Sequence, residues 1–304
     1  MDSSSGPRRV DETKEAELGF VNAGVPGWKL ASKFFPSKLG GKPAWLALQD
    51  LPSDEDLRCR RCQERMAFLL QIYAPIETRV DGFHRTLFVF LCRTASCGLQ
   101  NAECSNMAVF RSQLPRENPY YSFHPTPEKD DSPGPSVADF HAICWVCGQP
   151  AYGKRCSKCK TATYCSALHQ KTDWKAGHRK ACGEYSESEL LAMAKPEEDP
   201  VCERFLRRVR MYPEQVLRYH MKSEPLWVSV ENQISLSAVP PCALCGAPRH
   251  FEFQIMPQLL THLSLGSEKD AVDWGTIAVY TCSDSCRPSE YAREFLWKQD
   301  FSPN

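Results

Sequence analysis

Cysteines and histidines gather in the middle of the chain at spacings that suit metal binding. Residues 144–182 read CWVCGQPAYGKRCSKCKTATYCSALHQKTDWKAGHRKAC. The order is C-x2-C, eight residues, C-x2-C, five residues, C-x3-H, eight residues and H-x3-C. A structural zinc ion takes four thiolate or imidazole ligands. Eight such residues therefore predict two zinc sites in this segment.

Two pairings of these eight ligands are open. A C-x2-C turn supplies two ligands, and residues four apart on one helical face supply two more. The most compact arrangement is a cross-brace, and the rival is a sequential pairing. The cross-brace places Cys144, Cys147, Cys165 and His169 on one ion, and Cys156, Cys159, His178 and Cys182 on the other.

Two further cysteine quartets lie outside this segment. Cys59, Cys62, Cys92 and Cys97 give C-x2-C, 29 residues and C-x4-C; Cys242, Cys245, Cys282 and Cys286 give C-x2-C, 36 residues and C-x3-C. We expect each quartet to hold Zn²⁺ and to join the ends of a β-hairpin or meander, which makes up to four zinc ions in all. Cys104 is an alternative to Cys97, and thiols packed as small apolar side chains are an alternative to metal.

Both outer quartets belong to a segment that occurs twice. Five residues match at a constant offset of 183: Cys59 and Cys242, Cys62 and Cys245, Phe68 and Phe251, Gln71 and Gln254, Ile72 and Ile255. A second block, TLFVFLC at 86–92 and TIAVYTC at 276–282, matches at an offset of 190. Alternating β-branched and aromatic residues predict strands in both copies.

These elements predict an α+β, β-rich fold with duplicated strand modules and a zinc finger inserted between them. Residues 17–114 and 201–304 are expected to be the two halves of one domain, and the second half opens with an amphipathic helix interrupted by Pro213. Between the halves lie three segments: a proline-rich linker at 115–141, the finger at 142–183 and an acidic connector at 184–200.

Composition limits the classes of protein to consider. Sixteen cysteines follow a polar N-terminus without a signal-like apolar run, so we expect reduced thiols and bound metal rather than disulfides. The densest apolar run has seven residues, too few to cross a membrane. Residues 144–182 carry eight lysines and arginines against one aspartate, a net charge of +7, so the rest of this neutral chain carries −7.

The central cluster resembles the MYND zinc finger, above all in the run from Tyr164 and Cys165 to His178 and Cys182. His169 stands where that family usually has a cysteine. The resemblance implies a small scaffold held by two zinc ions. As ligand of the finger we expect a proline-rich peptide, or an acidic peptide attracted by the net charge of +7. MYND fingers also occur in lysine methyltransferases, but the NH-x-C signature of their catalytic domain is absent from this sequence, as are a phosphate-binding glycine loop and a nucleophile elbow. We expect no enzyme.

Motifs along the whole chain resemble the programmed cell death protein 2 family. They are FFPSKLGGKPAWL, LLQIYAP, VFRSQLPREN, the MYND segment, YPEQVLRY, FEFQIMPQLL and EFLWKQD, which together span about residues 17–301. Members of that family commonly carry a long acidic insertion after the finger, whereas this chain has only EYSESELLAMAKPEEDP.

The resemblance implies a dedicated chaperone of small-subunit (40S) ribosome biogenesis, present in the cytoplasm and the nucleus. Its implied client is the small-subunit ribosomal protein near the mRNA entry site, bound by the β-rich domain. A basic client would be attracted by the net charge of −7 outside the finger. The alternative is a MYND-type adaptor in transcriptional regulation or in the control of apoptosis and proliferation. Direct sequence-specific DNA binding is not expected.

Overall fold

A computed structural model of the chain describes residues 16–98, 104–151, 154–156, 162–175, 200–263, 272–287 and 291–301. The strands are Glu17–Gly19 (β1), Lys38–Leu39 (β2), Ala67–Tyr73 (β3), His84–Leu91 (β4), Met107–Leu114 (β5), Lys154–Arg155 (β6), Thr163–Tyr164 (β7), Leu217–Tyr219 (β8), Arg249–Ile255 (β9), Thr276–Cys282 (β10) and Tyr291–Gln299 (β11). The α-helices are Ala167–Asp173 (α1) and Pro200–Met211 (α2). Short 3₁₀ turns span Gly27–Leu30, Ser32–Phe34, Val80–Gly82, Ala95–Cys97, Val137–Asp139, Leu236–Ala238 and Pro257–His262. The β-rich fold class is thus confirmed.

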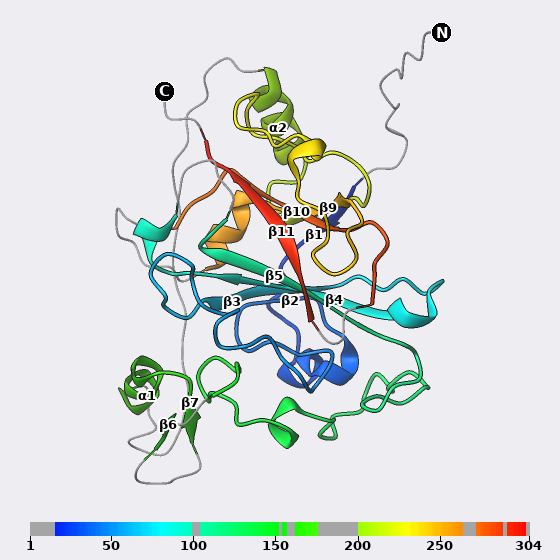
Figure 1. Cartoon of the computed structure of the whole chain (residues 1–304), viewed down its shortest axis with the longest axis vertical. Helices are drawn as coiled ribbons and strands as arrows, with labels where there is room; N and C mark the ends of the chain where they lie inside the picture. The colour runs from blue at the N-terminus through cyan, green and yellow to red at the C-terminus, as the bar shows by residue number, and fades with distance from the viewer. Residues whose placement is uncertain are drawn as a thin grey trace.

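One antiparallel sheet of nine strands dominates the molecule, in the order β1-β8-β9-β10-β11-β5-β4-β3-β2 (Figure 1). Strands β2 to β5 form one meander, here called the N-terminal half, and β8 to β11 form a second, the C-terminal half. The two meanders join through β5 and β11, in register from Tyr291 opposite Ser112 to Glu294 opposite Val109. The two copies of the duplicated segment therefore build the two halves of a single sheet.

The duplication extends to an irregularity in the strand pairing. In β3, Leu69 is an extra residue between the pairs Phe68–Phe90 and Leu70–Val89. In β9, Glu252 is the extra residue at the corresponding place, 183 positions later. A β-bulge of this kind bends and twists its strand. Both halves therefore curl at the same point.

A buried glutamine in each half forms two hydrogen bonds to the backbone of a segment that packs on the sheet. Gln71 Oε1 accepts a hydrogen bond from the N–H of Ala44 (2.8 Å), and its Nε2 donates to the oxygen of the same residue (3.2 Å). Gln254 makes the same two bonds with Leu226, at 2.6 and 2.9 Å. Each held residue precedes a buried tryptophan, in the sequences KPAW and EPLW. The matched glutamines thus explain why both copies keep this residue.

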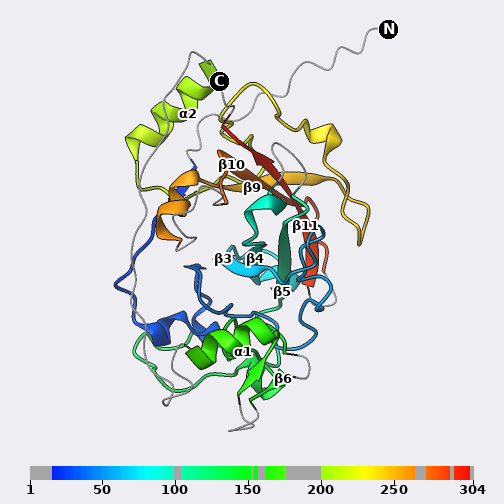
Figure 2. The same ribbon diagram turned by 90° about the vertical axis from the view of Figure 1, so that its left-hand side faces the viewer.

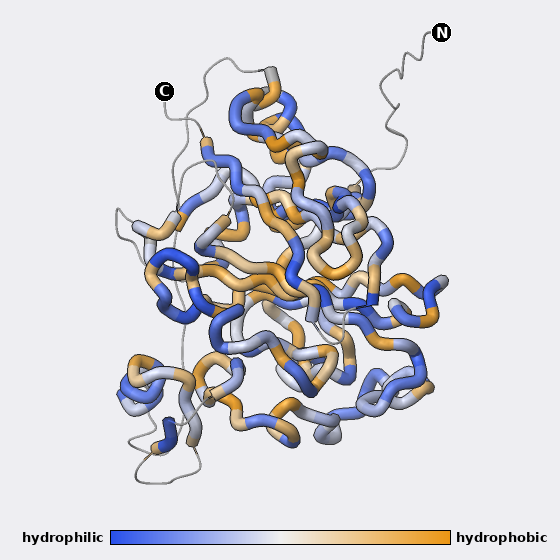
Figure 3. The backbone as a smooth tube through the Cα atoms, viewed as in Figure 1, coloured by the Kyte–Doolittle hydropathy of each residue, from blue (hydrophilic) through white to orange (hydrophobic). Residues whose placement is uncertain are grey.

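The inner face of the curled sheet encloses the largest hydrophobic cluster, to which both halves contribute. Its members include Leu70, Ile72, Leu87, Val89, Phe253, Ile255, Ile277 and Val279. Each half also has an apolar cluster on its outer face, built around Trp45 in the N-terminal half and around Trp227 in the C-terminal half. Hydrophobic residues accordingly run along the central strands in Figure 3. Because the halves share one interior, we expect them to unfold together.

Buried ion pairs also connect the halves. Arg85 on β4 binds Glu252 on β9, and Arg111 on β5 binds Glu294 on β11 at 2.7 Å. Arg249 binds the other oxygen of Glu294 at 2.8 Å. Three strands separate β4 from β9 along the sheet, so the first of these pairs crosses the interior.

The segment at 115–141, expected as a linker, packs along the N-terminal half. The buried Tyr121 hydroxyl donates to the backbone oxygens of Trp45 (3.1 Å) and Leu46 (2.7 Å). The Lys33 amine bonds Ser132 and forms an ion pair with Asp130 at 3.0 Å. The connector at 184–199 lies outside the described residues.

Figures 1 and 2 show the finger, with α1 and β6, at one end of the molecule and α2 at the other. Helix α2 ends at Met211, two residues before Pro213, because proline cannot continue a helix. The expected continuation of the helix beyond Pro213 is wrong, since strand β8 follows at Leu217–Tyr219 and pairs with β9. No helix in the described ranges is long and apolar enough to cross a membrane.

Candidate metal centres

Three C-x2-C turns in different parts of the chain share one backbone conformation. In each, the residue after the second cysteine donates its N–H to the oxygen of the first cysteine: Gln63 to Cys59 (2.9 Å), Gly148 to Cys144 (2.9 Å) and Gly246 to Cys242 (2.8 Å). These three residues have φ of 61°, 66° and 74°, in the left-handed region. The first cysteine in turn donates its own N–H to the backbone oxygen of the residue five positions later in the chain, at 2.8 to 2.9 Å. This turn points both sulfurs of each pair to the same side.

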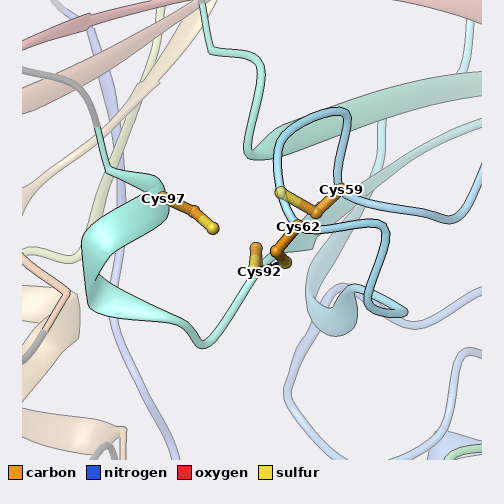
Figure 4. Close-up of side chains that lie close together, drawn as sticks. All are labelled: Cys59, Cys62, Cys92 and Cys97. Carbon is orange, nitrogen blue, oxygen red and sulfur yellow. Dashed lines mark hydrogen bonds between the residues drawn. The ribbon is translucent and has the colours of Figure 1, made fainter.

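The N-terminal tetrad joins that turn to the far end of β4. Cys59 and Cys62 precede β3, Cys92 follows β4, and Cys97 ends a 3₁₀ turn (Figure 4). All four sulfurs lie within 4.8 Å of one another, with Cys62 and Cys92 at 3.6 Å. Cys104, the alternative ligand, is a buried member of the inner hydrophobic cluster instead.

The C-terminal tetrad repeats this plan and is also held by the other half of the sheet. Cys242 and Cys286 lie 3.7 Å apart, Cys245 and Cys282 3.6 Å, and the four sulfurs lie within 4.8 Å of one another. Arg111 of β5 donates to the backbone oxygen of Cys286 at 2.8 Å and contacts its sulfur at 3.7 Å.

Further contacts hold the loop between Cys282 and Cys286. Arg79 donates to the oxygen of Asp284 at 2.7 Å, and Gln113 donates to that of Ser285 at 3.3 Å. Sequence reasoning missed these residues of the N-terminal half, since nothing in their spacing marks a contact with a loop 172 to 205 positions away.

The finger brings together one of the two predicted ligand sets. Cys144 and Cys147 come from the turn, Cys165 follows β7, and His169 lies in α1, whose N-cap Ser166 accepts a hydrogen bond from the His169 N–H. The His169 Nδ1 atom lies 3.6 Å from the Cys144 sulfur and 3.1 Å from that of Cys165. This grouping is the one that the cross-brace pairing requires. In the second set Cys156 is buried, whereas Cys159, His178 and Cys182 lie outside the described residues.

The spacing within the three tetrads fits zinc. With Zn–S bonds of about 2.3 Å, tetrahedral geometry places sulfurs about 3.8 Å apart. The observed sulfur separations of 3.6 to 3.7 Å are close to that value, and they are far longer than a disulfide bond of about 2.05 Å. The three tetrads are therefore compatible with Zn²⁺, and four protein ligands at each leave no position for a substrate, as in structural zinc sites.

Crowding makes the thiols of each tetrad unequal in acidity. Burial raises the pKa of Cys97 to about 12, with hydrogen bonds from neighbouring cysteines adding to the effect. At Cys62 burial acts in the same direction, but the backbone of Glu64 and the other three thiols outweigh it and lower the pKa to about 7. Hydrogen bonds to Cys144 and Cys165 raise the pKa of His169 to about 9. Metal would have to displace several protons, so its affinity should fall in acid.

The finger is attached to the N-terminal half through its first zinc turn. The Trp45 indole donates to the Gly148 oxygen at 3.1 Å. The fully buried Gln149 side chain donates to the oxygen of Met66 at 2.8 Å, and Arg65 donates to that of Pro150 at 2.7 Å. Met66 and Arg65 lie between the Cys62 turn and β3, so the finger is packed beside the N-terminal tetrad.

Family models match most of the chain. The N-terminal domain of programmed cell death protein 2 matches residues 15–128, and the C-terminal putative domain of that protein matches residues 199–300. A MYND finger matches residues 144–182, between the two. The chain belongs to the programmed cell death protein 2 family. The two domain models of this family thus correspond to the two halves of one sheet.

Individual relatives extend this result. The chain is 41% identical to Programmed cell death protein 2 of Bos taurus over 342 aligned residues, which cover 94% of this chain and 97% of that protein. It is 27% identical to Programmed cell death protein 2-like of Mus musculus, with 90% and 92% covered. Over 94 residues, 28% of this chain and 23% of the other, it is 34% identical to Probable 20S rRNA accumulation protein 4 of Schizosaccharomyces pombe. No solved structure matches the chain.

Proposed function

We propose that this protein is a non-enzymatic zinc protein that acts as a dedicated chaperone for a small-subunit ribosomal protein, in the cytoplasm and the nucleus. The client we propose is the ribosomal protein near the mRNA entry site. The observation that carries the proposal is the similarity to a relative named for the accumulation of 20S rRNA. Family membership supports it, because the match to mammalian relatives covers nearly the whole chain.

The charge of the sequence supports a basic client. Outside residues 144–182 the chain carries a net charge of −7, of which residues 183–199 contribute −5. Eight exposed acids lie on the N-terminal half and the segment that packs along it, among seven exposed lysines and arginines. The acids are Asp50, Glu55, Glu64, Glu77, Glu117, Glu128, Asp131 and Asp139. Tyr120 bonds Gln49 at 3.3 Å, which places the two stretches beside each other. A ribosomal protein without its RNA is an unshielded cation, so these acids and those of residues 183–199 would attract it and compete with nonspecific RNA.

The rigidity of this surface also suits a chaperone. Each half has a cysteine tetrad compatible with Zn²⁺, and buried ion pairs join the halves to each other. A preformed surface loses little conformational entropy on binding, which favours affinity for a partner that is itself poorly ordered.

Co-expression of the full-length protein with the tagged ribosomal protein, followed by native mass spectrometry, tests this function. We expect a one-to-one complex that retains its zinc and weakens as salt is raised. Charge reversal by Glu128→Lys and Asp131→Lys should weaken the complex at least about tenfold. The exposed Glu214→Lys and Glu231→Lys, on the C-terminal half, serve as the matched control. The proposal fails if no complex forms, or if the control pair weakens it equally.

A protein-binding adaptor is the second candidate, supported by apolar side chains on the finger. Trp145 is 43% exposed, Trp174 38% and Leu168 65%. Exposed tryptophans are common anchors at interfaces, and a proline-rich or acidic peptide is the ligand we would expect there. If Trp174→Ala abolished capture of the ribosomal protein while both acidic variants bound normally, the adaptor function would replace the chaperone function.

A further inference from the structure

Helix α2 is fixed to the C-terminal half by one face. Phe205, 1% exposed, packs with the buried Val228 and Met256, and its ring lies 6.1 Å from that of Phe301. Leu206 and Val209 border the same cluster. These contacts set which face of the helix meets solvent.

The exposed part of the α2 surface carries four arginines. Arg204, Arg207, Arg208 and Arg210 are all exposed, and none of the four forms an ion pair within the described part of the chain. Residues three and four apart on a helix have Cβ atoms about 5–6 Å apart. Arg204, Arg207 and Arg208 therefore form a compact cationic surface.

Two exposed aromatic rings continue this surface beyond the end of the helix. Tyr212, four residues after Arg208, is 49% exposed, and Phe20 beside β1 is 52% exposed. Their ring centroids are 6.4 Å apart at an interplanar angle of 69°. Met211, 58% exposed, follows the same side of the helix. Large apolar side chains this exposed, beside arginines that have no ion pair with any described residue, suit a ligand with both charge and flat apolar faces.

We propose that the α2 arginines and the Phe20–Tyr212 pair bind single-stranded RNA without sequence preference. Guanidinium groups donate paired hydrogen bonds to phosphate oxygens. Aromatic rings stack with unpaired bases, which all have a π face, whereas an acidic peptide gains nothing from them. Duplex RNA hides its bases and would also leave the rings unused. The site lies at the far end of the molecule from the basic finger (Figures 1 and 2).

The site gives the protein a second role beside client binding. In the proposed function, exposed acids of the N-terminal half and of the segment packed along it would hold the ribosomal protein, while α2 would hold RNA at the end of the molecule away from the finger. Client and RNA could then be bound together without competing for one surface. The RNA site does not depend on the client, so each can fail alone.

Fluorescence anisotropy of the full-length zinc-loaded protein with a labelled single-stranded uridine 15-mer tests the site. Each phosphate contact contributes about 0.7 to the slope of log affinity against log salt. Arg204→Ala with Arg208→Ala should weaken binding about tenfold or more and reduce that slope by about 1.4. Tyr212→Ala should weaken binding about fivefold or more with the slope unchanged, whereas Tyr212→Phe should bind as the parent does.

Lys171→Ala with Lys175→Ala, on the exposed surface of the finger, is the matched control and should bind RNA normally. Zinc content and thermal midpoint of every variant should equal those of the parent. The proposal is overturned if the finger variant loses RNA as much as the α2 variant does. It is also overturned if polyglutamate displaces the RNA at equal charge, which would indicate an acidic peptide, or if Tyr212→Ala has no effect.

Discussion

Arg85 on β4 and Glu252 on β9 form a two-pronged ion pair across the interior of the sheet, and neither side chain is exposed to solvent. The hydroxyls of Tyr219 and Thr281 also donate to the Glu252 carboxylate. Burial alone would raise the pKa of Glu252, but the charge and hydrogen bonds of Arg85 outweigh it and lower this pKa. The carboxylate is therefore ionised in the folded protein and tied to the other half of the sheet.

Arg85→Met should destabilise the whole chain, since it leaves a buried carboxylate without its cation. We expect a loss of about 3–5 kcal/mol in the free energy of unfolding, measured with urea. Both halves should unfold in one transition, because they share the interior. In the double variant Arg85→Met with Glu252→Leu, most of the loss should be recovered. Independent unfolding of the two halves, or a loss below about 1 kcal/mol, would contradict this interpretation.

The part of the fold that could be predicted depends on residues that have the same structural role in both copies of the duplicated segment. A thiolate ligand requires a cysteine, and the first two ligands of each tetrad form a C-x2-C pair. The pairs that begin at Cys59 and Cys242 therefore indicated the metal sites directly. Gln71 and Gln254 matched because each holds the chain before a tryptophan. A third repeated block, KPAWLALQD at 42–50 and EPLWVSVEN at 224–232, carries the same signal. It ends in a left-handed residue in both copies, Asp50 with φ 47° and Asn232 with φ 57°.

Other features could not be predicted because the two copies differ or the partners are distant. The repeated bulge holds Leu69 in one half and Glu252 in the other, since an extra residue needs a backbone shape rather than a side chain. Arg85 lies 167 positions from Glu252, and no local pattern links them. Gln149 contacts Met66 only because the finger packs on the sheet, a contact that the proline-rich composition of 115–141 gave no reason to expect.

Zinc loss at either outer tetrad should destabilise both halves. Cys62→Ser or Cys245→Ser removes one ligand from a site that ties strand ends together. A domain has a free energy of unfolding of roughly 5–15 kcal/mol, and a structural zinc can contribute a large share of it. Native mass spectrometry should count four zinc ions in the parent and three in each variant. Limited proteolysis should then cut throughout 17–114 and 201–304. A protected fragment 201–304 in Cys62→Ser would show independent halves.

Attachment of the finger should depend on Gln149. Replacement by alanine leaves the buried oxygen of Met66 without a donor, at a cost of about 1–3 kcal/mol. We expect faster hydrogen exchange in residues 144–150 and around Met66, with zinc content unchanged. Gln170→Ala provides the control, because Gln170 bonds Arg155 within the finger on an exposed surface. Equal exchange in the two variants would mean that the finger does not depend on this contact.

Stability should fall in mild acid through His84. This ring is 7% exposed, stacks on Phe35 at 4.1 Å between centroids and bonds the Tyr73 hydroxyl at 2.9 Å. Burial, with a smaller effect of the Arg116 charge, lowers its pKa from 6.5 to about 4. Between these values the unfolded chain binds a proton that the folded chain does not. Each unit of pH decrease within this window should therefore cost up to about 1.4 kcal/mol of unfolding free energy.

Acid also protonates zinc ligands, so the comparison must isolate the histidine. His84→Phe keeps a flat ring against Phe35 but cannot take up a proton, and its thermal midpoint should fall less between pH 6.5 and pH 4.5 than that of the parent. His124→Phe changes an exposed ring and should follow the parent. All three proteins should release zinc at the same pH. If His84→Phe loses stability as steeply as the parent, the acid sensitivity belongs to the metal centres, and the buried ring does not contribute.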